Sequence, residues 1–168
     1  MFYRQLEHNE VHNNCRKFPV IVICENIESP DNVGMIFRNC EAMGVEEIIF
    51  TGSSIQLPNR KIRKISRSTD KRVKHSYIET TTNAISMLLE KKFNVYAIEI
   101  TKSSQSIHSF KFKDNCSYAL LVGSEKDGVD EESLQLVKDC IEIPLFGSNT
   151  SINVVSALTI ALYELTKQ

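Results

Sequence analysis

Short apolar runs alternate along the chain with longer segments whose apolar positions have helical spacing. Within the runs, apolar and polar residues do not alternate, which is typical of strands buried on both faces of a parallel sheet. The runs predict strands over residues 20–24, 46–52, 94–100, 118–123 and 141–145, with a smaller strand over 76–80.

In the segments between these runs, apolar residues recur at helical intervals. Ser29 to Asn32 supply turn and N-cap residues, apolar positions follow at helical intervals, and Gly44 ends this helix. We expect further helices before Pro19, over 82–92, from an Asp130 cap through Leu134, Leu136 and Val137, and after Thr150. The alternation predicts a single α/β domain over 1–168, with a mainly parallel sheet and helices on both of its faces.

The helix after Thr150 is apolar on more than one side. One broad face carries Ile152, Val155, Leu158, Ala161, Leu162 and Leu165, and the opposite face carries Val154, Ala157 and Ile160. Two interpretations fit this pattern equally: a helix buried partly by a second copy of the chain, or an ordinary core helix with Ser151 as its N-cap. Ser151 and Asn153 are polar residues at the start of an apolar helix, and this placement also suggests a site.

Composition fits a globular domain large enough to bury a core. The chain has 168 residues, of which 42% are hydrophobic and 24% charged. Its apolar runs are far too short to cross a bilayer. Acidic and polar residues at the N-terminus occupy the place of a signal peptide's apolar segment. We therefore expect a cytoplasmic protein without a membrane partner.

The cysteines and histidines predict no metal site. Five cysteines occur without a CxxC pair, which favours reduced thiols over disulfides or zinc ligands. His8 and His12 have the spacing of two ligands on one helix face, but no third ligand accompanies them, so we interpret them as part of a solvated helix.

Basic residues are concentrated in one segment. Residues 60–75 contain eight bases and one acid, a net charge of +7, whereas the rest of the chain has twelve bases and twenty acids, a net charge of −8. A solvated charged loop is the ordinary explanation, but this density, with hydroxyl side chains among the bases, suits a phosphate backbone. We predict RNA binding by Lys61, Arg63, Lys64, Arg67, Lys71 and Arg72.

Four loops after predicted strands are the places to look for chemistry, because ligands of open α/β sheets bind beyond the carboxyl ends of the strands. These loops cover 29–32, 101–104, 123–128 and 147–153. The GxGxxG fingerprint is absent after the first strand, and the sequence has no GxxxxGK[ST] motif, which argues against a nicotinamide-dependent oxidoreductase and a P-loop NTPase. None of the loops contains a serine nucleophile elbow.

Three segments carry a resemblance to a known family. NVGMIFRNCEAMG (32–44), LLVGSEKDGV (120–129) and IPLFGSNTSINV (143–154) resemble the three ordered motifs of the SpoU or TrmH-type RNA ribose 2′-O-methyltransferases, in the SPOUT superfamily. The resemblance implies an enzyme that uses S-adenosylmethionine to methylate tRNA or rRNA, without a metal. It also implies a C-terminal trefoil knot and a homodimer with the active site near the subunit boundary.

The resemblance also implies roles for individual residues. Cofactor binding is expected from Glu99, Gly123, Gly128, Ile143, Leu145, Ser151 and Ile152, and catalysis from Arg38, Asn32, Glu125, Ser151 and Asn153. Arg38 is the family's proposed base or phosphate clamp, and we favour the clamp because a guanidinium seldom loses a proton. Glu125 could orient either Arg38 or Asn32, or simply fix its own loop.

Family members often carry an additional N-terminal RNA-binding domain, whereas residues 1–18 predict only a short extension. RNA capture would then depend on the basic segment of the core itself. A catalytically silent RNA-binding or ribosome-assembly protein that keeps the fold is the alternative function. A small-molecule enzyme that uses another nucleotide is a third hypothesis, but it gives the basic segment no purpose.

Overall fold

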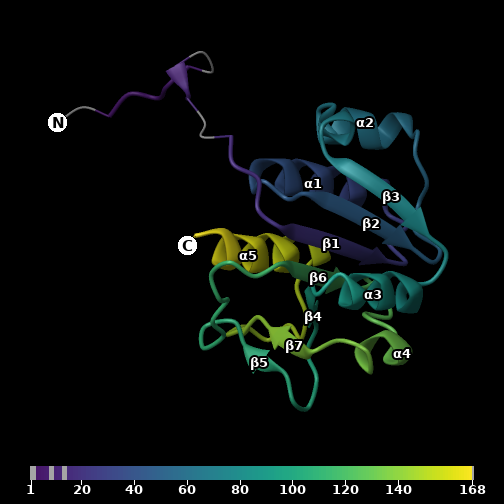
Figure 1. Cartoon of the computed structure of the whole chain (residues 1–168). Coiled ribbons are helices and arrows are strands. Elements are labelled where there is room, and N and C mark those ends of the chain that lie inside the picture. The colour runs from purple at the N-terminus through teal and green to yellow at the C-terminus, as the bar shows by residue number, and fades with distance from the viewer. Residues whose placement is uncertain (1–2, 8–9, 13–14, 168) are drawn as a thin grey trace.

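A computed structural model describes residues 3–7, 10–12 and 15–167, which form a twisted parallel sheet with helices on both faces (Figure 1). The strands are β1 (Val20–Glu25), β2 (Glu47–Thr51), β3 (Lys74–Ile78), β4 (Asn94–Ile98), β5 (Gln105–Ser106), β6 (Tyr118–Val122) and β7 (Asp139–Glu142). The helices are α1 (Pro30–Ala42), α2 (Arg60–Ser66), the 3-10 helix η2 (Thr69–Lys71), α3 (Thr81–Glu90), α4 (Glu131–Leu134) and α5 (Val154–Thr166).

The order of the strands creates a switch point in the middle of the sheet. The order is β3-β2-β1-β6-β4-β7-β5, and neighbouring strands are parallel, with Val22 in register with Ile48 on one side and Leu120 on the other. The chain therefore builds outward from β1 to β3 and then crosses to the other half of the sheet. All carboxyl ends meet at one edge, where ligands of such sheets bind.

Two cores cover the two faces of the sheet, because successive residues of a strand point to opposite sides. On one face Val20, Val22 and Cys24 of β1 pack with apolar residues of α1 and α5. On the other face Ile21 and Ile23 pack with the buried side of α3. This burial of β1 on both sides confirms the interpretation of the continuous apolar runs.

Helix α1 begins and ends as the sequence predicts. Ser29 is the N-cap and accepts a hydrogen bond from the Asn32 amide at 3.4 Å, and Pro30 occupies the first turn. Gly44 follows the helix with a φ of +67°, and a Cβ there would lie 2.2 Å from the Arg16 carbonyl oxygen, so only glycine fits. The short link from β1 to Ser29 places the first turn of α1 at the carboxyl edge of the sheet.

The basic segment folds against α1. Asn59 caps α2, and Ile62 of α2 is fully buried. Gly34 of α1 provides the room for this contact, because a Cβ at position 34 would lie 2.7 Å from the side chain of Ile65. The apolar side of α2 thus packs on α1 and leaves its basic side exposed.

Several predicted boundaries are wrong. Residues 3–7, 10–12 and 15–18 contain no α-helix, and His8 lies outside the described residues. Helix α4 has four residues, so Leu136 and Val137 lie beyond it. Strand β7 ends at Glu142, because the backbone leaves the sheet before Pro144. The two-residue strand β5 was not predicted, since the polar pair Gln-Ser carries no strand signal.

Ser151 is not the N-cap of the last helix. Helix α5 begins at Val154, and Asn153 caps it by accepting a hydrogen bond from the Val155 amide at 2.8 Å. The predicted apolar face of α5 is buried from Val155 to Leu165, whereas Ile152 precedes the helix and is exposed. Ile160 and Tyr163 on its other side are 38% and 59% exposed, so the single chain leaves part of this helix uncovered.

Candidate active site

A cavity of about 660 Å³ opens at the carboxyl ends of β4, β6 and β7, beside the start of α5. Apolar side chains from the strand ends line it together with backbone from the loops that follow. Its lining comprises residues 98–101, 122–129, 134, 141–143, 145, 151–154 and 157. A volume of this size is typical of cofactor and small-ligand sites.

The loop after β6 turns so tightly that two glycines are required. The Ser124 amide donates to the Gly128 carbonyl and the Gly128 amide to the Ser124 carbonyl, both at 3.0 Å. A Cβ on Gly123 would lie 2.1 Å from the Gly128 carbonyl carbon and oxygen, and Gly128 has a φ of +72°. The loop therefore presents backbone, rather than side chains, to the cavity at these two positions.

All seven residues predicted to bind the cofactor line this cavity: Glu99, Gly123, Gly128, Ile143, Leu145, Ser151 and Ile152. The Glu99 carboxylate also has a role within the protein, since it accepts hydrogen bonds from the Val129 amide at 3.1 Å and the Ile100 amide at 2.9 Å. Glu99 therefore holds the loop after β6 against the end of β4.

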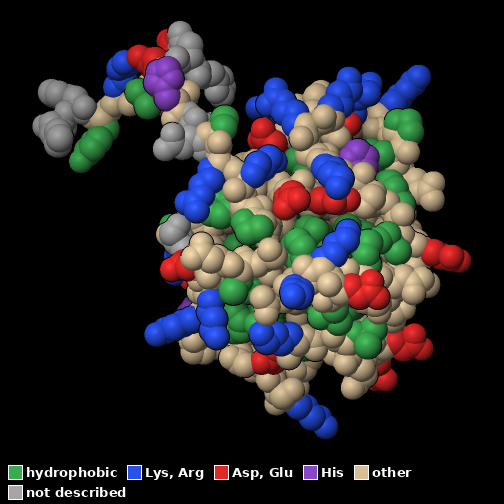
Figure 2. Space-filling model, viewed as in Figure 1, with side chains coloured by type: hydrophobic (Ala, Val, Ile, Leu, Met, Phe, Trp, Pro, Cys, Tyr) green, Lys and Arg blue, Asp and Glu red, His purple; other side chains and the backbone are tan. Residues whose placement is uncertain are grey.

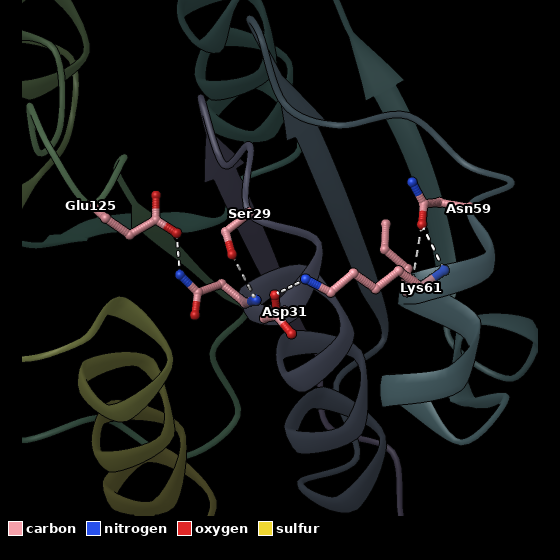
Figure 3. Close-up of polar contacts among 7 residues, drawn as sticks. Ser29, Asp31, Asn59, Lys61 and Glu125 are labelled. Atoms are coloured by element: carbon pink, nitrogen blue, oxygen red, sulfur yellow. Dashed lines mark hydrogen bonds and ion pairs between the residues drawn. The ribbon is translucent and has the colours of Figure 1, made fainter.

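Three of the predicted catalytic side chains form one hydrogen-bonded row. The Asn32 amide nitrogen donates to the Glu125 carboxylate, and the Asn153 amide nitrogen donates to the Asn32 carbonyl oxygen at 3.1 Å. Figure 3 shows the Glu125 carboxylate reaching from its loop toward the first turn of α1. Residues from all three motifs, with Asn32 more than 90 positions from the other two, thus meet at the cavity, and Glu125 orients Asn32 rather than Arg38.

The remaining two predicted catalytic residues differ in position. Ser151 lines the cavity and is exposed. Arg38 does not line the cavity; it lies six residues beyond Asn32 in α1, about 9 Å along the helix axis. Arg38 is half-buried and, among the described residues, makes no side-chain hydrogen bond or ion pair.

The basic segment is connected to this row of side chains. The Lys61 ammonium contacts Asp31, which precedes Asn32 in α1, and Asn59 caps the helix that carries Lys61 (Figure 3). The amino end of α2 therefore lies beside the first turn of α1, on the side opposite Glu125 (Figure 3). Figure 2 shows lysine and arginine side chains gathered at the end of the molecule where α2 lies.

The six predicted RNA-binding residues fall into two groups. Lys61 contacts Asp31, and Arg72 lies 3.6 Å from the Glu41 carboxylate. The other four are exposed and have no acidic partner among the described residues: Arg63, Lys64, Arg67 and Lys71. Lys74, in the same segment, contacts the Glu47 carboxylate at 2.7 Å. The free positive charge is thus smaller than the count of bases predicts.

Glu25 is a polar residue near the site that the sequence reasoning missed. It ends β1, is only 1% exposed, and accepts hydrogen bonds from the Asp130 amide at 2.9 Å and the Ser133 hydroxyl at 2.6 Å. The sequence does contain an indication of such a residue, because an acid directly follows the apolar run VIVIC. A carboxylate at the end of a buried strand needs hydrogen-bond donors.

The cysteines have no role in this site. Burial raises the pKa of the Cys24 and Cys40 thiols, so both are poor nucleophiles.

In the described part of the chain, no group of three or more His, Cys, Asp or Glu side chains is placed to hold a metal ion. The helices of the described residues are all too short or too polar to cross a membrane.

Known proteins resemble the chain in sequence. A tRNA (guanosine(18)-2′-O)-methyltransferase of Thermus thermophilus is 30% identical over 153 residues, which cover 91% of this chain and 77% of that protein. The 23S rRNA (guanosine-2′-O-)-methyltransferase RlmB of Blochmanniella floridana is 28% identical over 151 residues, covering 89% of this chain. The matched part is 58% of RlmB, so the chain spans less than two thirds of that relative.

The fold is also shared with solved structures. An AdoMet-bound rRNA methyltransferase from Sinorhizobium meliloti superimposes with a TM-score of 0.83 at 21% identity, covering 98% of this chain and 61% of that one. Residues 19–163 match the SpoU rRNA Methylase family, and this span includes every residue that lines the cavity. The chain therefore belongs to the SpoU rRNA Methylase family.

Proposed function

We propose that the protein is an S-adenosylmethionine-dependent methyltransferase that methylates a ribose 2′-hydroxyl of tRNA or rRNA. The observation that carries this proposal is the hydrogen-bonded row of Asn32, Glu125 and Asn153 at the mouth of the cavity. The proposal is also supported by the names of the relatives, which are guanosine 2′-O-methyltransferases of tRNA and rRNA.

The cavity suits S-adenosylmethionine in shape and chemistry. Gly123 and Gly128 leave the backbone accessible where a Cβ could not fit, and apolar walls such as Val122, Ile141 and Leu145 suit an adenine ring. The charged residues in the lining are four acids and one base, Lys126, which favours a ligand with a sulfonium and an ammonium group. Bound S-adenosylmethionine would supply an electrophilic methyl group, held by the seven residues described above.

The residues around the cavity mouth would position the RNA hydroxyl. The side-chain nitrogen of Asn32 donates to Glu125, and its side-chain oxygen accepts from Asn153. These bonds hold the side-chain amides of Asn32 and Asn153 in one orientation. Ser151 makes no side-chain hydrogen bond among the described residues, and its hydroxyl is free to bind the ribose or a water. We assign Arg38 the role of clamping the target phosphate, since the planar fork of guanidinium donors matches the geometry of a phosphate.

RNA would be held along the exposed side of α2 and of η2, which follows it. Arg63, Lys64, Arg67 and Lys71 present their charges to solvent, and Lys61 lies between this surface and the site. Such an arrangement guides a phosphate backbone toward the cavity mouth without reading its sequence. This basic surface makes tRNA or rRNA a better fit than a free nucleoside.

In a homodimer, the partner subunit would cover the exposed side of α5. Ile160 and Tyr163 are exposed there, and α5 packs on α1, where Asn39 donates a hydrogen bond to the Thr159 hydroxyl at 2.6 Å. Arg38 adjoins Asn39 in α1, so the partner would lie near the proposed phosphate clamp. A single domain over 1–168, the knot and a cytoplasmic location remain parts of this proposal that follow from the family resemblance and the sequence.

Transfer of a labelled methyl group from S-adenosylmethionine to RNA tests the proposal. Purified protein is incubated with tRNA or rRNA, and the RNA is digested so that the modified nucleoside can be identified. We expect label in a 2′-O-methyl nucleoside. RNA binding without cofactor binding or methyl transfer would instead show a catalytically silent RNA-binding protein.

A further inference from the structure

We propose that Glu25 is a positioning residue that fixes the loop forming one wall of the cofactor cavity. This inference rests on the proposed function for the identity of the cofactor. Glu25 does not line the cavity, so its effect would be transmitted through the loop between Gly123 and Asp130.

Both oxygens of the Glu25 carboxylate are used inside the protein. One accepts a hydrogen bond from the Asp130 amide at 2.9 Å and the other from the Ser133 hydroxyl at 2.6 Å. Ser133 is itself 2% exposed, so water cannot readily replace these contacts. Among the described residues, no cation pairs with Glu25, and the carboxylate depends on these two donors.

Because of the strand order, the contact made by Glu25 has a counterpart on the other side of β6. Strand β6 lies between β1 and β4, and a carboxylate stands at the carboxyl end of each flanking strand: Glu25 on β1 and Glu99 just after β4. Glu99 accepts from the Val129 amide, and Glu25 accepts from the next amide along the chain, that of Asp130. Two consecutive amides that follow the Gly123 to Gly128 turn are thus held from both sides.

The loop needs this support because the element that follows it is short. Helix α4 has only four residues, and the Asp130 side chain does not cap it. The Asp130 carboxylate instead accepts from the Asn26 amide nitrogen at 3.3 Å. Since so short a helix is not stable by itself, contacts from β1 help to set where Val129 and Leu134 stand in the cavity wall, beside their apolar packing in the core shared with α3.

The variant Glu25→Gln tests the role with little change of shape. Glutamine offers one acceptor oxygen, so its amino group must face either the Ser133 hydroxyl, which can rotate and accept, or the Asp130 amide, which cannot. Thr51→Val is a matched control, because Thr51 ends β2, pairs with Glu25 in register and is also 1% exposed. Its hydroxyl contacts Thr81 at 2.7 Å, away from the cavity.

Three quantities are measured for each variant: the Kd for S-adenosylmethionine by calorimetry, the Kd for RNA at fixed salt, and hydrogen exchange of the Val129 and Asp130 amides. For Glu25→Gln we expect a Kd for the cofactor raised about 10-fold, because two hydrogen bonds to a carboxylate become weaker hydrogen bonds to a neutral amide. RNA affinity should stay within about twofold, and both amides should exchange faster. Thr51→Val should change none of the three.

Cofactor affinity unchanged in Glu25→Gln, or lowered equally in Thr51→Val, would overturn the proposal. If Glu25→Gln fails to fold, Ser133→Ala keeps the carboxylate and removes one of its donors, and the same shifts are expected at a smaller size. If the unaltered protein binds RNA but not S-adenosylmethionine, the proposed function fails. The exchange rates of the two amides still decide whether Glu25 fixes the loop.

Discussion

The two halves of the sheet use their polar residues in opposite ways. Around β6 and β4, Glu25, Glu99 and Glu125 each have hydrogen-bond partners inside the protein, and together they shape a cavity. Around β2 and β3, the exposed bases of α2 mostly point to solvent without a partner among the described residues. In the proposed function, the first half would hold one small ligand in one position, and the second a long polyanion in many positions.

If the proposed function is right, this difference separates binding of the cofactor from capture of the RNA. Changes in the cavity half should alter cofactor affinity or the rate of methyl transfer, with little effect on RNA affinity. Changes in the basic half should alter RNA affinity and its salt dependence. Arg38 is the residue expected to connect the two, because it lies in α1, which contacts both the basic helix and the site.

Replacing Arg38 by alanine should have the largest effect. Removal of a charge that stabilises the transition state typically lowers the rate by about 10²–10³-fold, and cofactor affinity should persist because Arg38 does not line the cavity. Single-turnover methyl transfer and calorimetry measure the two quantities. Arg16→Ala, which removes an exposed arginine stacked on Phe18, is the control; full activity of Arg38→Ala would exclude Arg38 from catalysis.

Gly123→Ala should be the next most damaging change. Its Cβ would meet the Gly128 backbone at 2.1 Å, whereas a Cβ on Gly147 would meet nothing within 4 Å. We expect Gly123→Ala to lower the free energy of unfolding by about 1–3 kcal/mol, as overpacking does, and to weaken cofactor binding. Gly147→Ala should leave the free energy of unfolding unchanged in chemical denaturation, and equal stability of the two variants would contradict the described loop.

Neutralising the unpaired bases should have a moderate effect confined to RNA. With Arg63, Lys64 and Arg67 changed to alanine, the slope of log K against log salt should fall by about 1 for each phosphate that the variant no longer neutralises. Changing Arg72 and Lys74, which have acidic partners, should lower the slope less. A salt series by fluorescence anisotropy measures this. Identical slopes for the two sets would show that pairing with acids does not decide which bases bind RNA.

Removal of the Lys74 ammonium should give the smallest effect, which is measured on stability. Burial raises the pKa of Glu47, but hydrogen bonds from Lys74 and Ser76 and the lysine charge outweigh it, so the pKa of Glu47 lies below its usual 4.5. A carboxyl with a lowered pKa stabilises the fold above that value, and the contribution disappears as the pH falls through the lowered pKa. Lys74→Met should therefore lower Tm more at pH 7 than at an acidic pH below the lowered pKa of Glu47. An equal decrease at both pH values would assign the effect to packing.

The strands were predictable because burial on both faces requires continuous apolar runs, and the runs in VIVIC and YALLV leave little choice. The last helix was harder to delimit. Ser151 and Asn153 are both good N-cap residues, and the chain bends so that Asn153 takes the role while also reaching Asn32. Asn153 and Asn32 are 121 positions apart in the sequence, yet their hydrogen bond helps to decide where the helix begins. The local spacing of residues carries no information about such a contact.

The site was predictable as a set of residues, but its internal hydrogen bonds were not. The motif resemblance named Asn32, Glu125 and Asn153 without indicating that Asn32 lies between the other two. It did not indicate Glu25, whose importance appears only once β6 is seen between β1 and β4. Counting charges could not indicate which bases have acidic partners for the same reason, since the acids that pair with Lys61, Arg72 and Lys74 are distant in sequence.

Methyl transfer from labelled S-adenosylmethionine to RNA, followed by nucleoside analysis, tests the central claim most directly. We predict label on a ribose 2′-oxygen, disappearance of that label in Arg38→Ala, and cofactor binding that survives in this variant. Label on a base, or no transfer by a protein that binds both S-adenosylmethionine and RNA, would contradict the proposed function.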